Sequence, residues 1–332
     1  MREYILFRGE ALGDTVMRLL PIHIRALLQP VHDRFDGLQE IHLRKNAPIT
    51  VLCNSRQWFL CNTGGYTNDR KKAWIVNESD IKQTIEYVSD YSLYAYEAEL
   101  RQGFLTVVGG HRVGIAGQVI LEHGRVKSVN HISFLNIRVA HEIKGCANHV
   151  FPYIVKGRRM LHTLIISPPG CGKTTLLRDM IRLLSDGYGD FEGVNVSVVD
   201  ERSEIAACYK GSPQNDIGIR TDVMDCCPKV EGMMMLLRSM NPNVIAVDEI
   251  GSREDVEAIS YIIRCGCGIL ATVHGESVDD IRTKPVFRKL VEEKMFDRYI
   301  VLSNRNGIGS IENIFDERGN ALYMPSPCVV GL

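Results

Sequence analysis

SPPGCGKTT, residues 167–175, is the stretch that decides the fold of this 332-residue chain. An apolar run typical of a buried strand, LHTLII, comes directly before it, and an amphipathic helical pattern, TTLLRDMIRLL, overlaps its end. Small residues in such a position let successive backbone N–H groups wrap phosphate oxygens, and the start of a helix adds partial positive charge. The sequence therefore predicts a phosphate-binding loop between a strand and a helix.

The residue types within this loop match the chemistry of a nucleotide site. Gly170 and Gly172 leave room for the phosphates. Lys173 can reach the β- and γ-phosphates, and the Thr174 hydroxyl can bind Mg²⁺. The pattern departs from the usual one at its first position, where Ser167 replaces a glycine at the exit of the strand. We expect ATP and Mg²⁺ as ligands, with nucleotide contacts from Pro168, Pro169, Gly170, Cys171, Gly172, Lys173, Thr174 and Thr175.

A second acidic motif ends the strand-like run in NVIAVDEIG, residues 243–251. At the carboxyl edge of a strand, Asp248 can hold the magnesium shell, and Glu249 can orient and deprotonate an attacking water. Paired acids argue against a kinase, whose acceptor is a substrate hydroxyl, and the chain has no N-K-x-D signature for guanine. We therefore expect an ATPase, with Glu249 as its base and with Thr174 and Asp248 as metal ligands.

Two further strand ends point to the same edge of the sheet. VVDERSE presents Asp200, Glu201 and Glu204, and ATVHG presents Thr272 and His274. In an open α/β sheet the ligand lies outside the carboxyl ends of the strands, so these groups should line one crevice. We expect catalytic roles for Glu201 and His274, although a single histidine is more often structural.

The alternation of strand and helix patterns separates the chain into two halves. In the second half the strand-like runs LHTLIIS, VNVSVVD, NVIAVDE and GILATV alternate with helical patterns, which predicts an α/β domain with a parallel sheet at residues 159–332. Residues 1–140 read as a smaller α+β domain, and 141–158 as a linker. Within the first half we expect a strand pair around Lys45–Pro48, a hairpin turn at Gly109–Gly110 and a helix capped by Ser79.

Composition excludes several other classes of protein. The formal net charge is −1, so no basic field indicates a nucleic-acid or anionic-membrane partner. No run approaches the roughly 20 apolar residues of a membrane span, and charges at Arg2, Glu3 and Arg8 interrupt any signal peptide, so we expect a cytoplasmic protein. The ten cysteines lack the paired spacing of zinc sites and are expected to be reduced thiols.

The order of these motifs resembles that of the type II and type IV secretion ATPases, in which the corresponding elements are called Walker A, Asp box, Walker B and His box. The most specific block is LLRSMNPNVIAVDEIGSREDVEAI, which contains Arg238 and Asn241–Pro242 and which simple P-loop enzymes do not share. Within that superfamily, SPPGCGKTTLLRD, DERSEI, RTDVMDCCPK and EGMMMLLRSMNP resemble the stage III sporulation protein AA family of spore-forming Firmicutes.

The resemblance implies a RecA-like P-loop ATPase core with a smaller N-terminal α+β domain, assembled as a homo-hexamer with ATP between the two domains. It also implies arginines of the N-terminal domain that reach the γ-phosphate, for which Arg112 and Arg138 are the best candidates, with Arg101 behind them. It further implies a mother-cell protein, peripherally attached to membrane-embedded proteins of a sporulation complex. By this resemblance, hydrolysis of ATP by the protein would energise a secretion-like channel from mother cell to forespore.

Two other functions stay open at this point. RecA-like cores also drive motors on nucleic acid, although the neutral charge and the lack of an evident aromatic–basic groove argue against that partner. A nucleotide-dependent assembly switch with slow turnover would carry the same motifs.

Overall fold

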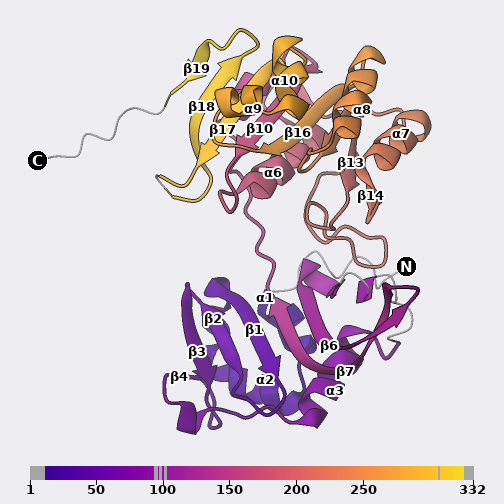
Figure 1. Cartoon of the computed structure of the whole chain (residues 1–332). Coiled ribbons are helices and arrows are strands. Elements are labelled where there is room, and N and C mark those ends of the chain that lie inside the picture. Colours follow the sequence, from indigo (N-terminus) through magenta and orange to yellow (C-terminus); the bar gives the residue numbers. More distant parts are fainter. Residues whose placement is uncertain (1–11, 93–95, 97–98, 101–102, 306, 325–332) are drawn as a thin grey trace, which may run out of the picture. The chain divides into compact units, whose positions relative to one another are not determined.

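The computed structural model describes residues 12–324, apart from 93–95, 97–98, 101–102 and 306 (Figure 1). The chain divides into two compact units. The N-terminal unit contains residues 1–141 together with 207–214, and the C-terminal unit contains residues 142–206 and 215–332. A short segment of the second half of the sequence therefore packs with the N-terminal unit.

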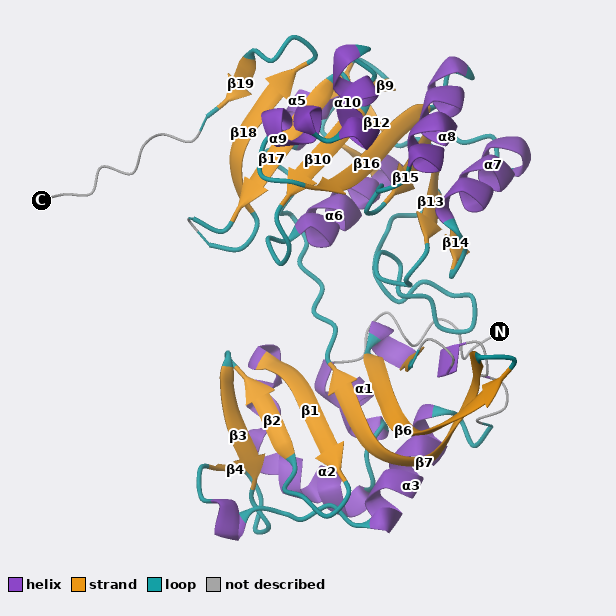
Figure 2. Cartoon of the chain, in the orientation of Figure 1, coloured by secondary structure: helices purple, strands orange, loops and turns teal. Residues whose placement is uncertain are grey.

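The N-terminal unit is built on a seven-stranded antiparallel sheet in the order β4-β3-β2-β1-β7-β6-β5 (Figure 2). The expected strand pair is confirmed, because Ile41 of β1 faces Val51 of β2 and, on the other side, Ile137 of β7. Val113 of β6 continues this row, and all four side chains are fully buried. The strands are β1 Leu38–Arg44, β2 Thr50–Cys53, β3 Arg56–Leu60, β4 Tyr66–Thr67, β5 Phe104–Thr106, β6 Arg112–Glu122 and β7 Arg125–Arg138.

Helices of this unit pack on the sheet, and one of them starts earlier than the sequence pattern indicated. The cap of α3 is Asn77 rather than Ser79, since the Asn77 side chain accepts from the backbone N–H of Asp80 and Asp80 accepts from that of Asn77. Asp80 is fully buried and also accepts from the Trp74 indole at 3.0 Å. The helices are α1 Leu12–Arg18, α2 Ile22–Leu28 and α3 Glu78–Val88, with 3₁₀ helices η2 Gln29–Gly37, η3 Arg70–Lys72 and η5 Val108–Gly110.

The C-terminal unit contains an eight-stranded sheet in the order β14-β13-β15-β16-β10-β17-β18-β19. The strands from β14 to β17 are parallel, as the alternating pattern predicted. The last two strands were not foreseen and pair antiparallel, because short turns join β17, β18 and β19 directly. The strands are β10 Thr163–Ser167, β13 Val196–Asp200, β14 Thr221–Asp225, β15 Val244–Val247, β16 Gly268–His274, β17 Arg298–Ser303, β18 Ser310–Asp316 and β19 Ala321–Tyr323.

Helices bury the central strands of this sheet on both faces. Ile245 and Val247 of β15 share an apolar cluster with residues of α7, α8, α9 and α10, while α6 packs against β10, β13 and β16. Two small strand pairs lie outside the main sheet, β8 Val155–Lys156 with β9 Arg159–Met160 and β11 Gly187–Tyr188 with β12 Phe191–Glu192. The helices are α5 Phe151–Ile154, α6 Lys173–Asp186, α7 Lys229–Ser239, α8 Arg253–Arg264, α9 Val278–Thr283 and α10 Pro285–Glu292.

Neither disulfides nor membrane-spanning helices occur in the part of the chain that the structure describes. Its cysteines are free thiols. None of its helices has the length and apolar character needed to cross a bilayer.

A buried histidine fixes the start of β6. His111 is fully buried, its Nε2 lies 2.8 Å from the Thr15 hydroxyl, and its Nδ1 accepts from the backbone N–H of Ala140 at 3.1 Å. Because Nδ1 accepts, the ring is neutral and Nε2 carries the proton. Burial, followed by the nearby charge of His141, lowers the pKa of His111 to about 4.

This histidine should make the N-terminal unit sensitive to acid. An unfolded histidine has a pKa of about 6.5, so between about pH 6.5 and 4 the unfolded state binds the extra proton and the free energy of unfolding falls, by about 3 kcal/mol in all. His111→Gln should flatten this dependence, whereas His123→Gln, at an exposed position, should not. Tryptophan fluorescence during urea unfolding reports this unit, because both tryptophans, Trp58 and Trp74, lie in it. Equal pH slopes for the native chain and His111→Gln would contradict the assignment.

Candidate functional site

The predicted phosphate-binding loop joins the end of β10 to the start of α6. Gly170 and Gly172 have φ angles of 73° and 82°, in the left-handed region that favours glycine. A Cβ on Gly172 would lie 3.2 Å from the Cα of Gly309, so the close approach of that neighbouring loop also requires glycine. The loop therefore exposes backbone N–H groups at the start of a fourteen-residue helix, as an anion site requires.

The register of the sheet aligns the functional strand ends. Ser167 at the end of β10 faces His274 at the end of β16. Val247, which comes directly before Asp248, pairs with Ala271 of β16 and with Val199 of β13. The acidic motif, the histidine and Asp200 therefore lie at one carboxyl edge, as the sequence predicted.

Asp248 is held in place by hydroxyl groups. Its Oδ2 accepts from Thr174 at 2.8 Å, the Thr272 hydroxyl donates to its Oδ1, and Lys173 Nζ lies 3.2 Å from Oδ1. A threonine hydroxyl beside a carboxylate is an all-oxygen donor set of the kind that Mg²⁺ prefers when substrate phosphates and waters complete its shell. The residues predicted as metal ligands are thus brought together and fit that ion.

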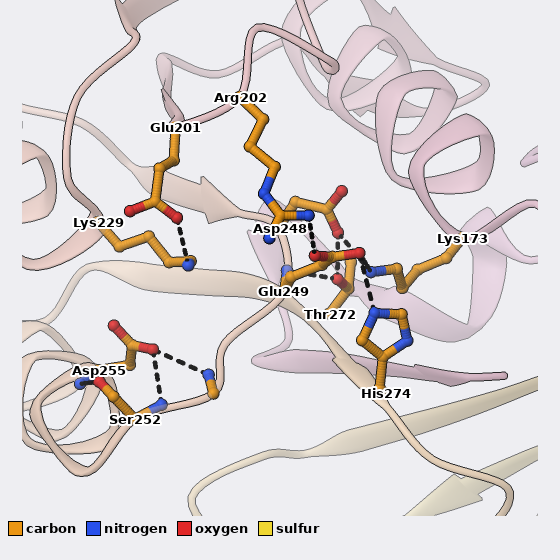
Figure 3. Close-up of polar contacts among 11 residues, drawn as sticks. Lys173, Glu201, Arg202, Lys229, Asp248, Glu249, Ser252, Asp255, Thr272 and His274 are labelled. Atoms are coloured by element: carbon orange, nitrogen blue, oxygen red, sulfur yellow. Dashed lines mark hydrogen bonds and ion pairs between the residues drawn. The ribbon is translucent and has the colours of Figure 1, made fainter. Parts of the chain in front are cut away.

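Glu249 is the most constrained side chain of the site (Figure 3). Its φ of 54° is uncommon for a residue other than glycine, and the Thr272 hydroxyl accepts from its N–H at 2.9 Å. Its Oε1 lies 2.9 Å from Lys173 Nζ and 3.0 Å from His274 Nε2. Its Oε2 accepts from Arg202 at 3.0 Å. One carboxylate therefore binds three basic side chains.

These neighbours set the ionisation of Glu249. Burial favours the neutral acid, but the hydrogen bond from Lys173 and the charges of Lys173, His274 and Arg202 together outweigh it and lower the pKa of Glu249. The carboxylate is therefore ionised at neutral pH. Lys173 in turn is only 7% exposed, so its ammonium group depends on the two carboxylates for compensation.

The loop after β13 is folded around Asp200. This carboxylate is 2% exposed and accepts from the backbone N–H groups of Glu204, Ile205 and Ala206 at 2.8–3.0 Å. The turn sends consecutive side chains in different directions, since Arg202 reaches Glu249 while Glu201 lies 2.6 Å from Lys229 of α7 (Figure 3). Glu201 still shares a narrow crevice with Asp248 and Glu249.

Sequence reasoning did not single out Arg202 or Lys229. The motif VVDERSE places Arg202 between acids after a strand, but it gives no sign that the side chain reaches Glu249. Lys229 opens α7 immediately after Pro228, and nothing local linked it to Glu201.

The two candidate arginines lie next to one another in the N-terminal unit. Arg112 of β6 pairs with Arg138 of β7. The Arg112 guanidinium lies 4.1 Å from the centre of the Phe104 ring, and Arg138 Nε lies 3.7 Å from Glu40. Their action on a γ-phosphate stays a prediction, and Arg101 lies outside the described residues.

Comparison with solved structures identifies the fold. The chain is similar to the ATPase DotB of Legionella pneumophila, with a TM-score of 0.53 at 15% identity, over 82% of this chain and 73% of that one. It is similarly related to the pilus retraction motor PilT, with a TM-score of 0.53 at 16% identity, over 82% of this chain and 77% of that one. The fold is therefore that of the RecA-like secretion ATPases, a core with an N-terminal domain, as expected.

Sequence relatives extend along most of the chain. It is 41% identical over 310 residues to stage III sporulation protein AA of Bacillus subtilis (strain 168), covering 93% of this chain and 97% of that protein. It is 31% identical over 159 residues to protein SEEDLING PLASTID DEVELOPMENT 1 of Arabidopsis thaliana, which is 47% of this chain and 22% of that one. The family model described as sporulation stage III, protein AA matches residues 11–322. This chain belongs to that family.

Proposed function

We propose that this protein is a magnesium-dependent ATPase that converts ATP to ADP and phosphate at the carboxyl edge of the C-terminal sheet. The observation that carries the proposal is the cluster of Lys173, Asp248 and Glu249, with Lys173 Nζ 2.9 Å from one carboxylate and 3.2 Å from the other. A lysine at the start of the helix after a glycine loop, next to two acids at the end of another strand of the same sheet, is the arrangement that phosphoryl transfer to water needs.

In this proposal the charge of the substrate rearranges the cluster. Lys173 turns from Glu249 to the β- and γ-phosphates, because their negative charge exceeds that of the carboxylate. Oε1 of Glu249, which then keeps only the contact with His274, can accept the proton of the attacking water, while Arg202 continues to hold Oε2. Bound to Thr174 and Asp248, Mg²⁺ would supply compensation for the charge of the phosphates. His274, at the same edge, would orient the carboxylate or the γ-phosphate, and Glu201 would hold the loop through Lys229.

The cellular role that we propose rests on the family and the fold taken together. Membership of a sporulation family, combined with a fold shared with secretion ATPases, supports a motor that energises a secretion-like channel between mother cell and forespore. We propose a homo-hexamer in the cytoplasm of the mother cell, attached to membrane-embedded proteins of the same complex. Arg112 and Arg138 would then compensate charge that develops on the γ-phosphate.

Two substitutions separate binding from hydrolysis. Lys173→Ala should abolish turnover and weaken binding of ATP, because the triphosphate loses its main cation. Glu249→Gln should retain binding and lose about 10²- to 10⁴-fold in kcat, the usual contribution of a positioned base. Calorimetry with Mg·ATP and phosphate release measure the two properties, and Lys289→Ala, an exposed lysine of α10, is the control. Full turnover in Glu249→Gln would remove this residue from the mechanism.

Arg202 should control the ionisation and position of Glu249. Because its charge helps to lower the pKa of Glu249, Arg202→Ala should move the acidic limb of the kcat/KM profile, which reports the free enzyme, to higher pH. It should also reduce kcat by about tenfold or more through misplacement of the carboxylate. Arg202→Lys should restore the pH limb in part, and Arg253→Ala, on the exposed start of α8, should leave the profile unchanged. An unshifted limb in Arg202→Ala would show that the contact has no role in turnover.

A mixing experiment tests whether active sites are shared between subunits. Chains carrying Lys173→Ala lack a working phosphate loop, and chains carrying Arg112→Ala or Arg138→Ala lack a candidate arginine. If each arginine acts on the nucleotide of a neighbour, mixed rings contain some sites with both parts intact, and ATPase activity should reappear. Activity no higher than the sum of the separate proteins would favour action within one chain.

A further inference from the structure

A second cavity lies in the C-terminal unit, at the edge of the sheet opposite to the phosphate-binding loop. It has a volume of about 600 Å³ and is lined where β15 and β16 begin, at Val244 and Gly268. The functional residues Asp248 and His274 lie at the other ends of these strands. The proposed ATPase site therefore makes no use of this cavity.

Three arginines line the cavity, and no carboxylate is among its described lining residues. Arg158 pairs with Glu192 at 2.8 Å, but both side chains are more than 70% exposed, so this pair is worth little. Arg159 contacts only the ring of His162, at 3.4 Å, among the described residues. Arg238 has no ion pair in the described part of the chain. The cavity thus has positive charge that the chain itself does not compensate.

Helix α7 ends at this cavity, where it lacks two of its helical hydrogen bonds. Pro242 has no N–H to donate to the carbonyl of Arg238 four residues earlier. The carbonyl of Ser239 loses its helical donor too, because the N–H of Asn243 donates to Asn195 instead. The end of α7 therefore leaves the carbonyls of Arg238, which lines the cavity, and of the adjacent Ser239 without their helical donors.

We propose that this cavity, which we call the arginine pocket (Arg158, Arg159, Arg238, Asn243, Tyr261 and Cys265), binds an acidic peptide segment of a partner protein. Guanidinium groups recognise carboxylates with two parallel hydrogen bonds, and the free helical carbonyls accept N–H groups from the backbone of the peptide. The exposed Tyr261 and Met240 at this end of the unit add apolar contact area.

A peptide fits this pocket better than a free phosphate does. Phosphate carries only one or two O–H donors at neutral pH, and the carboxyl end of a helix has partial negative charge that repels a compact anion. Carboxylates spaced along a peptide can pair with the arginines while its N–H groups face the helix end. An arginine at the carboxyl end of a helix, such as Arg238, is stabilised by the helix dipole without any ligand. The dipole does not explain Arg158 and Arg159, which belong to the β8–β9 hairpin.

Binding can be measured by fluorescence anisotropy with a fluorescein-labelled eight-residue peptide of alternating glutamate and glycine. The full-length protein should bind it in a saturable manner that weakens with salt. Arg238→Ala and Arg159→Ala should each weaken binding by about tenfold, because each removes a charge-assisted hydrogen bond. Arg288→Ala, an exposed arginine of α10 outside the pocket, is the matched control and should change nothing. Circular dichroism of each variant establishes that it is folded.

A second readout locates the peptide on the native chain without any substitution. Cys265 lines the pocket and is exposed, whereas Cys226, also exposed, lies directly after β14 at the other edge of the sheet. The peptide should slow alkylation of Cys265, measured by mass spectrometry, and leave that of Cys226 unchanged. Equal protection of both thiols, or binding that Arg238→Ala and Arg159→Ala do not affect, would overturn the proposal. Inorganic phosphate that displaces the peptide at equal concentration would show a simple anion site instead. None of these results depends on ATP hydrolysis.

Discussion

The C-terminal unit is organised around a buried ammonium group. Lys173 is almost fully enclosed, and a cation in that environment is tolerated only when opposite charges lie in contact with it. Asp248 and Glu249 supply those charges, and they reach Lys173 only because β15 and β10 flank β16 in parallel register. In the proposed reaction, a ligand that offers Lys173 a stronger negative charge would release Glu249 from the lysine, so that its carboxylate could accept a proton.

The loop after β13 contacts the cluster of Lys173, Asp248 and Glu249, and along the chain it leads to residues 207–214 of the N-terminal unit. Asp200 fixes residues 204–206 through three backbone N–H groups, and Arg202 within the loop binds Glu249. The chain then continues into 207–214, which packs with the N-terminal unit, where Lys210 pairs with Asp90 at 2.7 Å and the Gln214 side chain accepts from the Gly109 N–H.

The features that could be predicted from the sequence are those set by local residue patterns and by the geometry of parallel sheets. The phosphate loop, Asp248, Glu249 and His274 could be placed at one edge because strand ends of a parallel sheet must meet there. The contact between Arg202 and Glu249 could not be predicted, since the direction of a side chain in an irregular turn depends on the fold of the whole loop around Asp200. The sequence also did not show which residue caps α3, because both Asn77 and Ser79 are good capping residues. Asn77 is the cap in the structure, where its partner Asp80 is held by contacts with His23 and Trp74.

The polarity of parallel strands also explains why the two edges of the C-terminal sheet differ in chemistry. Helix α6 starts at the carboxyl edge, so that edge offers N–H groups and a partial positive charge, which suits phosphates. Helix α7 ends beside the opposite edge, so the free groups there are carbonyls, which cations complement and which peptide N–H groups can satisfy. A protein with this topology that binds a nucleotide at one edge has the other edge left for contacts of a different kind. The three arginines of the arginine pocket give that edge its specificity for acidic segments.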